Sequence, residues 1–174
     1  MVDIFVNTWG NYNTNGADGG KWISLPMEED ELHEVLGNIA KLMGDNDPEW
    51  TIHDYEWTSE IELRSISEYE SITALNRELL DMEVFNEYEL EEIVAAMDAF
   101  GYEFAEASYR QQNGYFTFYS GMDLEEVAEE IVNDCYFTKN TPEILTRYFD
   151  YEAFARDLGF DGYVETKYGV IYDN

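Results

Sequence analysis

Hydrophobic and polar residues in the first 61 positions follow a strand pattern, then a turn pattern, then a helix pattern. Apolar residues alternate with other residues over Asp3–Thr8 and Lys21–Leu25, and the Gly- and Asn-rich residues 9–20 between them are typical of turns. We therefore expect a hairpin with a long loop. Met27–Met43 carries apolar side chains at helical spacing, at Leu32, Val35, Leu36, Ile39 and Met43.

A third strand is expected at Trp50–Trp57, completing a small sheet with one helix across it. Strict alternation would place Trp50, Ile52, Asp54 and Glu56 on one side of this strand and Thr51, His53, Tyr55 and Trp57 on the other.

Residues 62–112 have the pattern of an all-helical unit. Ser71–Met82 has one apolar face, and Ser71 is suited to be its N-cap. Glu87–Phe100 has the clearest helical period, and a short helix is expected at Tyr102–Gln112. The outer face of the Glu87–Phe100 helix contains no Lys or Arg and carries Glu87, Glu91 and Asp98, with Glu89 and Glu92 nearby.

Residues 113–174 return to a mixed pattern. A strand is expected at Tyr115–Tyr119 and a helix at Asp123–Cys135, with Cys135 on its apolar face. Pro142 is expected to open a further helix, because proline is favoured at the first helical position. A helix over Asp150–Leu158, ended by Gly159, precedes a closing hairpin of Tyr163–Thr166 and Val170–Tyr172.

These patterns together predict an α+β protein. We expect an elongated chain of three small units (α+β, all-α and α+β), built from small antiparallel sheets with packed helices. The expected domains are residues 1–61, 62–112 and 113–174.

Charge changes this picture more than composition does. The hydrophobic fraction of 45% is enough for a folded core, but 39 acidic residues against 9 basic ones give a net charge of −30. The excess is distributed: residues 1–61, 62–106 and 107–174 each hold 13 acidic residues, against 2, 2 and 5 basic ones. Solubility alone needs a net charge of only about 2–8 in a small domain. Such a chain repels nucleic acid, and its expected partners are basic protein surfaces.

The single cysteine excludes an intramolecular disulfide and indicates a reducing, cytoplasmic setting. Residues 1–10 lack the basic and apolar regions of a signal peptide, and no run of 18 apolar residues exists. We expect no contact with membranes.

The helix over residues 123–135 shows how the acidic residues are arranged. Glu125 and Glu129, like Glu126 and Glu130, are four positions apart and therefore neighbours on the helix surface. Each such like-charge pair costs about 0.2–0.5 kcal/mol, which a lysine at one position would turn into a gain. Repeated omission of lysine indicates that the negative charge itself is functional.

Duplex DNA carries about one charge per 1.7 Å of its axis, so a charge of −30 corresponds to roughly 50 Å of duplex, or about 15 base pairs. DNA mimicry is therefore quantitatively possible. Adaptation to high salt would also give excess acid, but the many large aromatic residues favour extended protein-contact surfaces.

Other chemistry finds little support in the sequence. Gly19-Gly20-Lys21 leads into a strand rather than a helix N-terminus, so no phosphate loop is predicted. His33 and His53 are the only histidines. A di-metal helical site needs two acid-x-x-His elements, and the chain has only one, Asp30 to His33. Residues 45–48 do not fit a calcium loop. Without a nucleophile–base pair, we predict no enzyme, no catalytic residue, no metal and no cofactor.

Residues 142–163, PEILTRYFDYEAFARDLGFDGY, combine six large aromatic residues with five acids and two arginines. Aromatic rings must be buried while carboxylates stay hydrated. This combination indicates a contact surface between two protein bodies, with an acidic rim.

Several separated segments resemble the ArdA-type antirestriction proteins, in the right order and over nearly the full length. They are IFVNTWGNYNTNG and GGKWISLP near the N-terminus, then EWTIHDYE and SEYESITALNREL, and finally YFDYEAFARDLGFDGY and YGVIYDN. Residues 83–140 match mainly in helical character and charge.

This resemblance implies an elongated, three-domain acidic protein that dimerises through its C-terminal domain and is not an enzyme. It implies mimicry of bent B-form DNA and occupation of the DNA-binding groove of type I restriction–modification enzymes, in the service of mobile genetic elements. The family's antirestriction motif falls on about residues 138–151 and is associated with the dimer contact. The expected dimer residues are Leu145, Tyr148 and Phe149.

The residues expected to form the DNA-mimic surface are acids on the outer faces of the predicted helices. They are Glu28, Glu29, Glu31, Glu34, Glu87, Glu91, Asp98, Glu125, Glu126, Glu129, Glu130, Asp150, Glu152 and Asp157. Two alternatives remain open at this point: an acidic scaffold or chaperone for a basic DNA-binding protein, and an acid-rich metal-dependent or hydrolytic enzyme.

Overall fold

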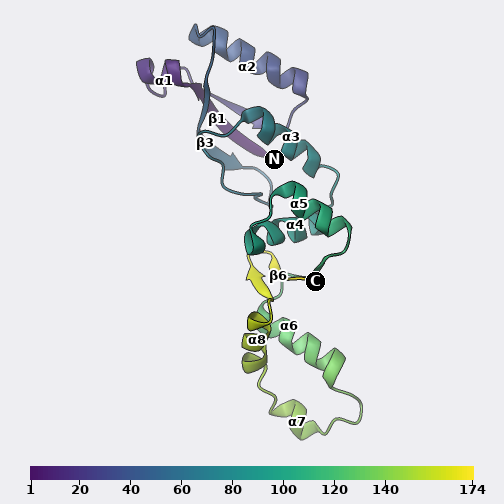
Figure 1. The fold of residues 1–174 in the computed structure, drawn as a ribbon. Helices are drawn as coiled ribbons and strands as arrows, with labels where there is room; N and C mark the ends of the chain where they lie inside the picture. Colours follow the sequence, from purple (N-terminus) through teal and green to yellow (C-terminus); the bar gives the residue numbers. More distant parts are fainter. The chain divides into compact units, whose positions relative to one another are not determined.

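A computed structural model describes residues 1–174, which divide into two compact units, Met1–Asn86 and Glu87–Asn174. Each unit contains one three-stranded antiparallel sheet together with several helices (Figure 1). The predicted α+β class, with small antiparallel sheets and packed helices, is therefore confirmed.

The first unit is built on a sheet with strand order β2-β1-β3. Strand β1 (Val2–Thr8) lies between β2 (Lys21–Leu25) and β3 (Trp50–Trp57) and is antiparallel to both. The predicted long-loop hairpin and third strand are thus confirmed. Apolar side chains of β1 and β2 share one face of the sheet and are buried, namely Val2, Ile4, Val6, Ile23 and Leu25.

A bulge in β3 makes the strict alternation predicted for this strand wrong. Phe5 is paired with Asp54 but Val6 is paired with Ile52, so His53 is an extra residue in β3. An extra residue moves every following side chain to the opposite face of the sheet. As a result Ile52 and Tyr55 both lie opposite buried residues of β1.

The loop between β1 and β2 contains a short helix, α1 (Trp9–Asn15), where the sequence predicted only turns. Thr8 is its N-cap, and the Thr8 hydroxyl accepts a hydrogen bond of 3.1 Å from the backbone N–H of Asn11. The buried Asn11 side chain donates to the Asn7 side chain at 2.9 Å and to the backbone oxygen of Asp18 at 2.7 Å. Asparagine side chains thus replace missing backbone partners and close the loop.

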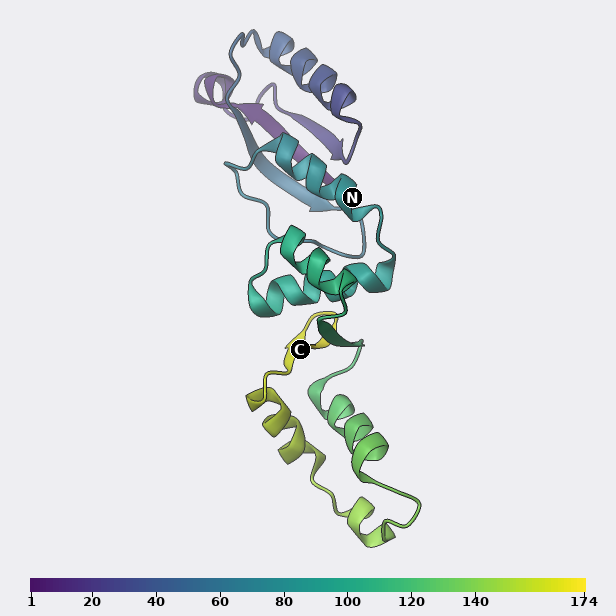
Figure 2. The same cartoon turned by 45° about the vertical axis from the view of Figure 1, so that its right-hand side comes forward.

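Two helices, α2 (Glu29–Met43) and α3 (Ile72–Met82), lie side by side over the apolar face of this sheet (Figure 2). Asn76 of α3 joins them to the loop before α2, because its amide donates to the Met27 oxygen at 2.8 Å and accepts from the Met27 N–H at 2.9 Å. Ser71 caps α3 as predicted and accepts from the Ala74 N–H.

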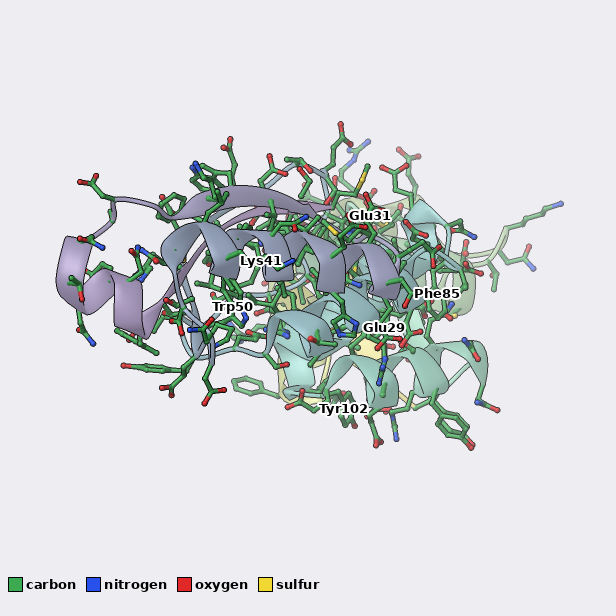
Figure 3. The ribbon with its side chains drawn as sticks, turned by 90° about the horizontal axis from the view of Figure 1, so that it is seen from above. Glu29, Glu31, Lys41, Trp50, Phe85 and Tyr102 are labelled. Atoms are coloured by element: carbon green, nitrogen blue, oxygen red, sulfur yellow. The ribbon has the colours of Figure 1, made fainter.

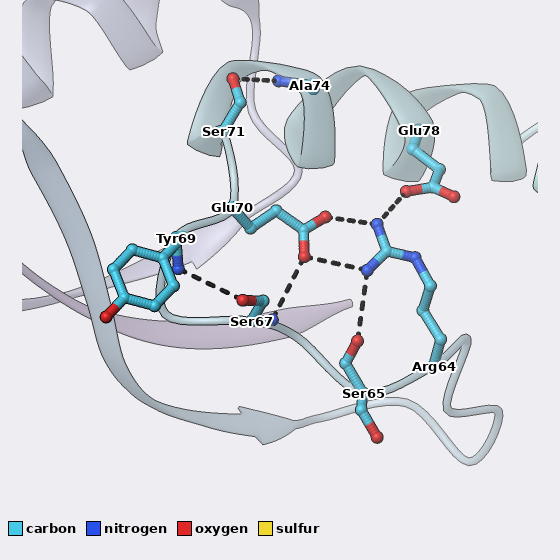
Figure 4. A network of polar contacts seen from close by, with 8 residues as sticks. All are labelled: Arg64, Ser65, Ser67, Tyr69, Glu70, Ser71, Ala74 and Glu78. Atoms are coloured by element: carbon cyan, nitrogen blue, oxygen red, sulfur yellow. Dashed lines mark hydrogen bonds and ion pairs between the residues drawn. The ribbon is translucent and has the colours of Figure 1, made fainter.

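An ion-pair network around Arg64 fastens the irregular segment between β3 and α3 (Figure 4). The Arg64 guanidinium donates to both carboxylate oxygens of Glu70 and, at 2.6 Å, to Glu78 of α3. The side chains of Glu70 and Glu78 are only 15% and 18% exposed. Hydrogen bonding to Glu70 raises the pKa of Arg64, and the same bond lowers the pKa of Glu70.

The second unit has the strand order β4-β6-β5. Its elements are α4 (Glu87–Phe100), α5 (Phe104–Gln112), β4 (Phe116–Ser120), α6 (Leu124–Ile131), the π-helix η1 (Val132–Tyr136), α7 (Glu143–Arg147), α8 (Tyr151–Phe160), β5 (Val164–Thr166) and β6 (Gly169–Asp173). The clearest helix predicted from the sequence, Glu87–Phe100, has the same bounds in the structure.

Helices cover both faces of the second sheet. On one face, Phe100 of α4 stacks on Phe116 of β4 with 6.3 Å between ring centroids. On the other face, Val170 of β6 joins a buried cluster with Val127 of α6 and Leu158 of α8. This second packing fixes the orientation of α6 and α8, which carry many of the predicted acidic residues.

The closing hairpin of β5 and β6 is confirmed, and Gly169 explains its tight turn. Gly169 has a φ of +140°, and a Cβ atom there would lie 2.2 Å from the backbone oxygen of Tyr119. Only glycine allows strand β4 to approach this closely.

A π-helical turn after α6 overturns the placement of Cys135 in the core. The Phe137 N–H bonds to the Val132 oxygen, five residues back, at 2.9 Å. This wider turn shifts the helical phase. Cys135 is therefore exposed, whereas Val132 remains buried. Helix α8 also differs from its predicted end, because it continues through Gly159 and ends at Phe160.

The predicted helical unit 62–112 is shared between the two compact units: α3 belongs to the first, and α4 and α5 belong to the second. The division into three domains remains a prediction.

Replacing Arg64 with alanine is expected to lower the free energy of unfolding by about 1.5–3 kcal/mol, because two largely buried carboxylates lose a charged hydrogen-bond donor. Urea denaturation measures this change. Since the folded-state pKa of Glu70 is lowered, the effect should be full above the ordinary glutamate pKa and should fade as pH falls through the lowered value.

The matched control is Arg77→Ala, which removes an ion pair with Glu29 whose two side chains are 68% and 55% exposed. This control should cost less than about 1 kcal/mol. Equal losses in the two variants would contradict the role assigned to Arg64.

Candidate protein-interaction surface

The first turns of α2 form a dense group of exposed carboxylates. Glu28, Glu29, Glu31 and Glu34 are all exposed, as predicted from the helix face. Glu29 is paired with Arg77 at 3.1 Å, whereas Lys41 lies near the far end of the same helix (Figure 3). Acids in the first turn are favoured by the helix dipole, so this end of the helix tolerates the group.

Helix α6 carries four exposed glutamates, Glu125, Glu126, Glu129 and Glu130, and none of them forms an ion pair. Its N-terminus is a capping box, in which Asp123 accepts from Glu125 and Glu126 backbone N–H groups and Glu126 accepts from the Asp123 N–H. The eight residues of α6 span about 12 Å. Four charges over this length give about one per 3 Å, close to the 3.4 Å spacing along one DNA strand.

On α4 the predicted acids are less uniform. Glu87 and Asp98 are exposed, but Glu91 is half-buried and accepts a hydrogen bond of 2.7 Å from the Ser120 hydroxyl. Glu92, which the sequence placed near the outer face, is buried at 9% exposure beside Gln111, whose amide donates to it at 3.2 Å. Burial raises the pKa of Glu92. Helical period alone did not reveal that α5 packs over this position.

On and before α8 the three predicted acids, Asp150, Glu152 and Asp157, are all exposed. Asp150 also has a local structural role, because it caps α8 by accepting from the Ala153 N–H at 2.9 Å. Its carboxylate thus contributes to folding as well as to surface charge.

The three predicted dimer residues differ in their surroundings. Leu145 and Tyr148 are 57% and 75% exposed. Phe149 is half-buried within its own chain, where its ring lies 5.5 Å from that of Phe137 and 5.0 Å from that of Tyr151. Sequence reasoning missed Ile144, which is 60% exposed beside Leu145. No signal in the sequence separates Ile144 from a buried apolar residue, because the five-residue length of α7 is visible only in the structure.

The two histidines lie on different elements of the first unit. His33 is exposed on α2, while His53 at the β3 bulge stacks on Tyr12 with ring centroids 4.2 Å apart. No group of three or more His, Cys, Asp or Glu side chains is arranged to hold a metal ion.

The sequence profile of the antirestriction protein (ArdA) family matches residues 4–172 of the chain. The protein belongs to the ArdA antirestriction family. The match covers both compact units and confirms the resemblance carried by the segments quoted above.

Membership of the ArdA family indicates an antirestriction role, in which the protein acts against restriction–modification enzymes as an inhibitor. A comparison with curated proteins gives no match. None of the helices of this ArdA protein is both long enough and apolar enough to cross a membrane.

Replacing Glu92 with glutamine is expected to raise the free energy of unfolding at neutral pH by about 0.5–2 kcal/mol, the usual range for relieving an unfavourable group. The folded-state pKa of Glu92 is raised, so its ionised form destabilises the fold above that pKa. The gain should shrink as pH falls through the raised value and vanish below the ordinary glutamate pKa. Urea denaturation at several pH values measures this dependence.

Glu87→Gln on the same helix serves as the control, because Glu87 is exposed and its replacement should change stability by no more than about 0.5 kcal/mol. A Glu92→Gln gain that does not depend on pH would rule out charge burial as its cause.

Proposed function

We propose that this ArdA-family protein mimics B-form DNA and competitively occupies the DNA-binding groove of type I restriction–modification enzymes. Membership of the family indicates the antirestriction role, and the exposed acidic helix faces are the surfaces proposed to imitate DNA. The target groove must bind a polyanion, so a surface of closely spaced, unpaired carboxylates can compete for the same basic side chains.

The observation that best supports this proposal is the glutamate face of α6. Its four carboxylates are exposed and form no ion pair, at an average of about 3 Å of helix axis per charge. The start of α2 adds a second group of exposed acids in the first unit, of which Glu29 is paired with Arg77. The protein thus forgoes the stabilisation that interspersed lysines would provide.

The stretch around α7 is proposed to be the dimer contact. Leu145 and Tyr148 present apolar surface that the chain itself does not cover. A symmetric contact through the C-terminal domain would join two acidic bodies, and the same patch would meet itself across a two-fold axis. Such a dimer would present twice the number of acidic faces to the enzyme.

The first test is displacement of a target duplex from a type I methyltransferase, measured by fluorescence anisotropy. The wild-type protein should displace the duplex at stoichiometric concentration, and its affinity should fall steeply with added salt, because surface charges are screened. A protein that leaves the duplex bound at stoichiometric concentration would contradict the proposed function.

A triple variant of Glu125, Glu129 and Glu130 to glutamine should weaken binding roughly 3- to 150-fold, since three ion pairs contribute about 0.2–1 kcal/mol each. The control replaces Asp18 and Glu60 with their amides together with Glu103→Gln, all exposed and outside the proposed faces. Equal weakening by the two triple variants would show that total charge, not the α6 face, determines binding.

Leu145→Asp or Tyr148→Asp is expected to convert the dimer to monomers without unfolding, because both side chains are mostly exposed in the single chain. Analytical ultracentrifugation measures the mass, and circular dichroism checks the fold. Leu42→Asp is the control, since Leu42 is 79% exposed on α2. A dimer that persists in Leu145→Asp would refute the assignment of α7 to the contact.

A further inference from the structure

An open pocket of about 490 Å³ lies in the second unit, between the end of α8, the π-helix and strand β6. Its volume falls in the range of about 300–1,000 Å³ that is typical of ligand sites. Aromatic rings and two carboxylates dominate its lining. The lining residues with aromatic or acidic side chains are Tyr136, Phe154, Tyr163, Tyr172, Asp157 and Asp161.

The aromatic rings form two packed pairs. Tyr163 stacks on Tyr172 with ring centroids 4.7 Å apart and 22° between planes, and Tyr136 meets Phe154 edge-on at 6.0 Å. Tyr136 is nevertheless 65% exposed. The rings are therefore held in place by neighbours while part of their surface remains available to a ligand.

Asp157 and Asp161 carry negative charges that are electrostatically unfavourable at the end of α8. They are four residues apart at the C-terminal end of α8, the negative end of the helix dipole, and the last turn contains no basic residue. Both side chains are exposed, and neither forms an ion pair or accepts a side-chain hydrogen bond. A cation in the pocket would offset both the repulsion between the two carboxylates and their repulsion by the negative end of the helix dipole.

The electrostatic surroundings of Tyr163 agree with a negative pocket. Burial raises the pKa of Tyr163, and the nearby Tyr172, Cys135 and Asp161 add to the rise. Among the residues that line the pocket there is no lysine or arginine.

The same unit shows how the protein binds a guanidinium with this kind of chemistry. Arg110 donates to the carboxylate of Asp173 and lies 5.0 Å from the ring centroid of Tyr102 and 5.3 Å from that of Tyr115. Tyr102 also donates to Asp173 at 2.6 Å. A carboxylate and aromatic rings thus surround one guanidinium, and the open pocket is lined by the same kinds of group.

We propose that the pocket between α8, the π-helix and β6 binds an arginine side chain presented by a basic partner protein. This inference rests on the proposed function, since a DNA-binding groove presents such arginines. Arginine fits better than lysine because its planar guanidinium stacks on aromatic rings and forms paired hydrogen bonds with carboxylates. The pocket would add one specific contact with the partner enzyme to the general attraction by the surface charge.

N-acetyl-arginine amide is a suitable probe, with the neutral N-acetyl-citrulline amide and with N-acetyl-lysine amide as comparisons. In NMR titrations of the full-length protein, the arginine probe should shift amide signals from Tyr136, Asp157, Asp161 and Tyr172. The citrulline probe should cause no comparable shift, and the lysine probe should bind at least about threefold more weakly.

Asp157→Asn combined with Asp161→Asn should weaken binding of the arginine probe about fivefold or more, and Tyr136→Ala should weaken it while leaving both carboxylates in place. The control combines Glu129→Gln with Glu152→Gln, which removes equal charge from exposed positions of the same unit. Binding that falls equally in the control, or that does not distinguish arginine from lysine, would show general charge attraction and overturn the proposal.

A second copy of the chain is the competing occupant, because Arg147 and Arg156 are exposed. If the arginine probe binds the Leu145→Asp monomer but not the wild-type dimer, the pocket is covered by the second copy and the proposal is wrong. The probe requires no enzyme, so failure of the wild-type protein to displace duplex DNA would count against the proposed function and not against the pocket.

Discussion

Mutual repulsion of carboxylates is the constraint on which the rest of this structure depends. A chain with a net charge of −30 must fold while its own charge opposes compaction. Each compact unit uses one half-buried arginine to hold acids that cannot remain fully hydrated: Arg64 bridges Glu70 and Glu78 in the first unit, and Arg110 bonds to Asp173 in the second. Few basic residues remain for the surface: the glutamates of α6 form no ion pair, and the group at the start of α2 has one, between Glu29 and Arg77.

Much of the secondary structure could be predicted because local signals agreed with tertiary packing. Ser71 capped the helix that the apolar period indicated, and Glu87–Phe100 matched in both bounds. The errors occurred where a single residue changed the phase. His53 is an extra residue in a strand, and the π-turn at Val132–Tyr136 rotates Cys135 out of the core. Both effects depend on hydrogen-bond partners in the folded chain, which periodicity does not encode.

The candidate surface was predictable to a similar degree. Helical faces correctly indicated that the glutamates of α6 are exposed, because nothing packs against them. Glu92 could not be identified as buried, since its burial depends on the packing of α5 on α4. The aromatic pocket was equally hidden: helix face predicts Asp157 only as a surface acid, and Asp157 lines one pocket with Tyr172 only because β6 packs beside α8 in the folded chain. Local sequence patterns do not reveal contacts between segments that are distant in the chain, so neither the burial of Glu92 nor the pocket could be predicted.

The half-buried position of Arg64 and Arg110 has a consequence for how this protein responds to ionic strength. Dissolved ions screen exposed charges much more than partly buried pairs. Added salt should therefore relieve repulsion among the surface acids while leaving the two internal arginine networks nearly intact. The folded state would gain stability under the same conditions in which its attraction for a basic partner declines. Release from a partner by salt would then deliver an intact protein, ready to bind again when the ions are diluted.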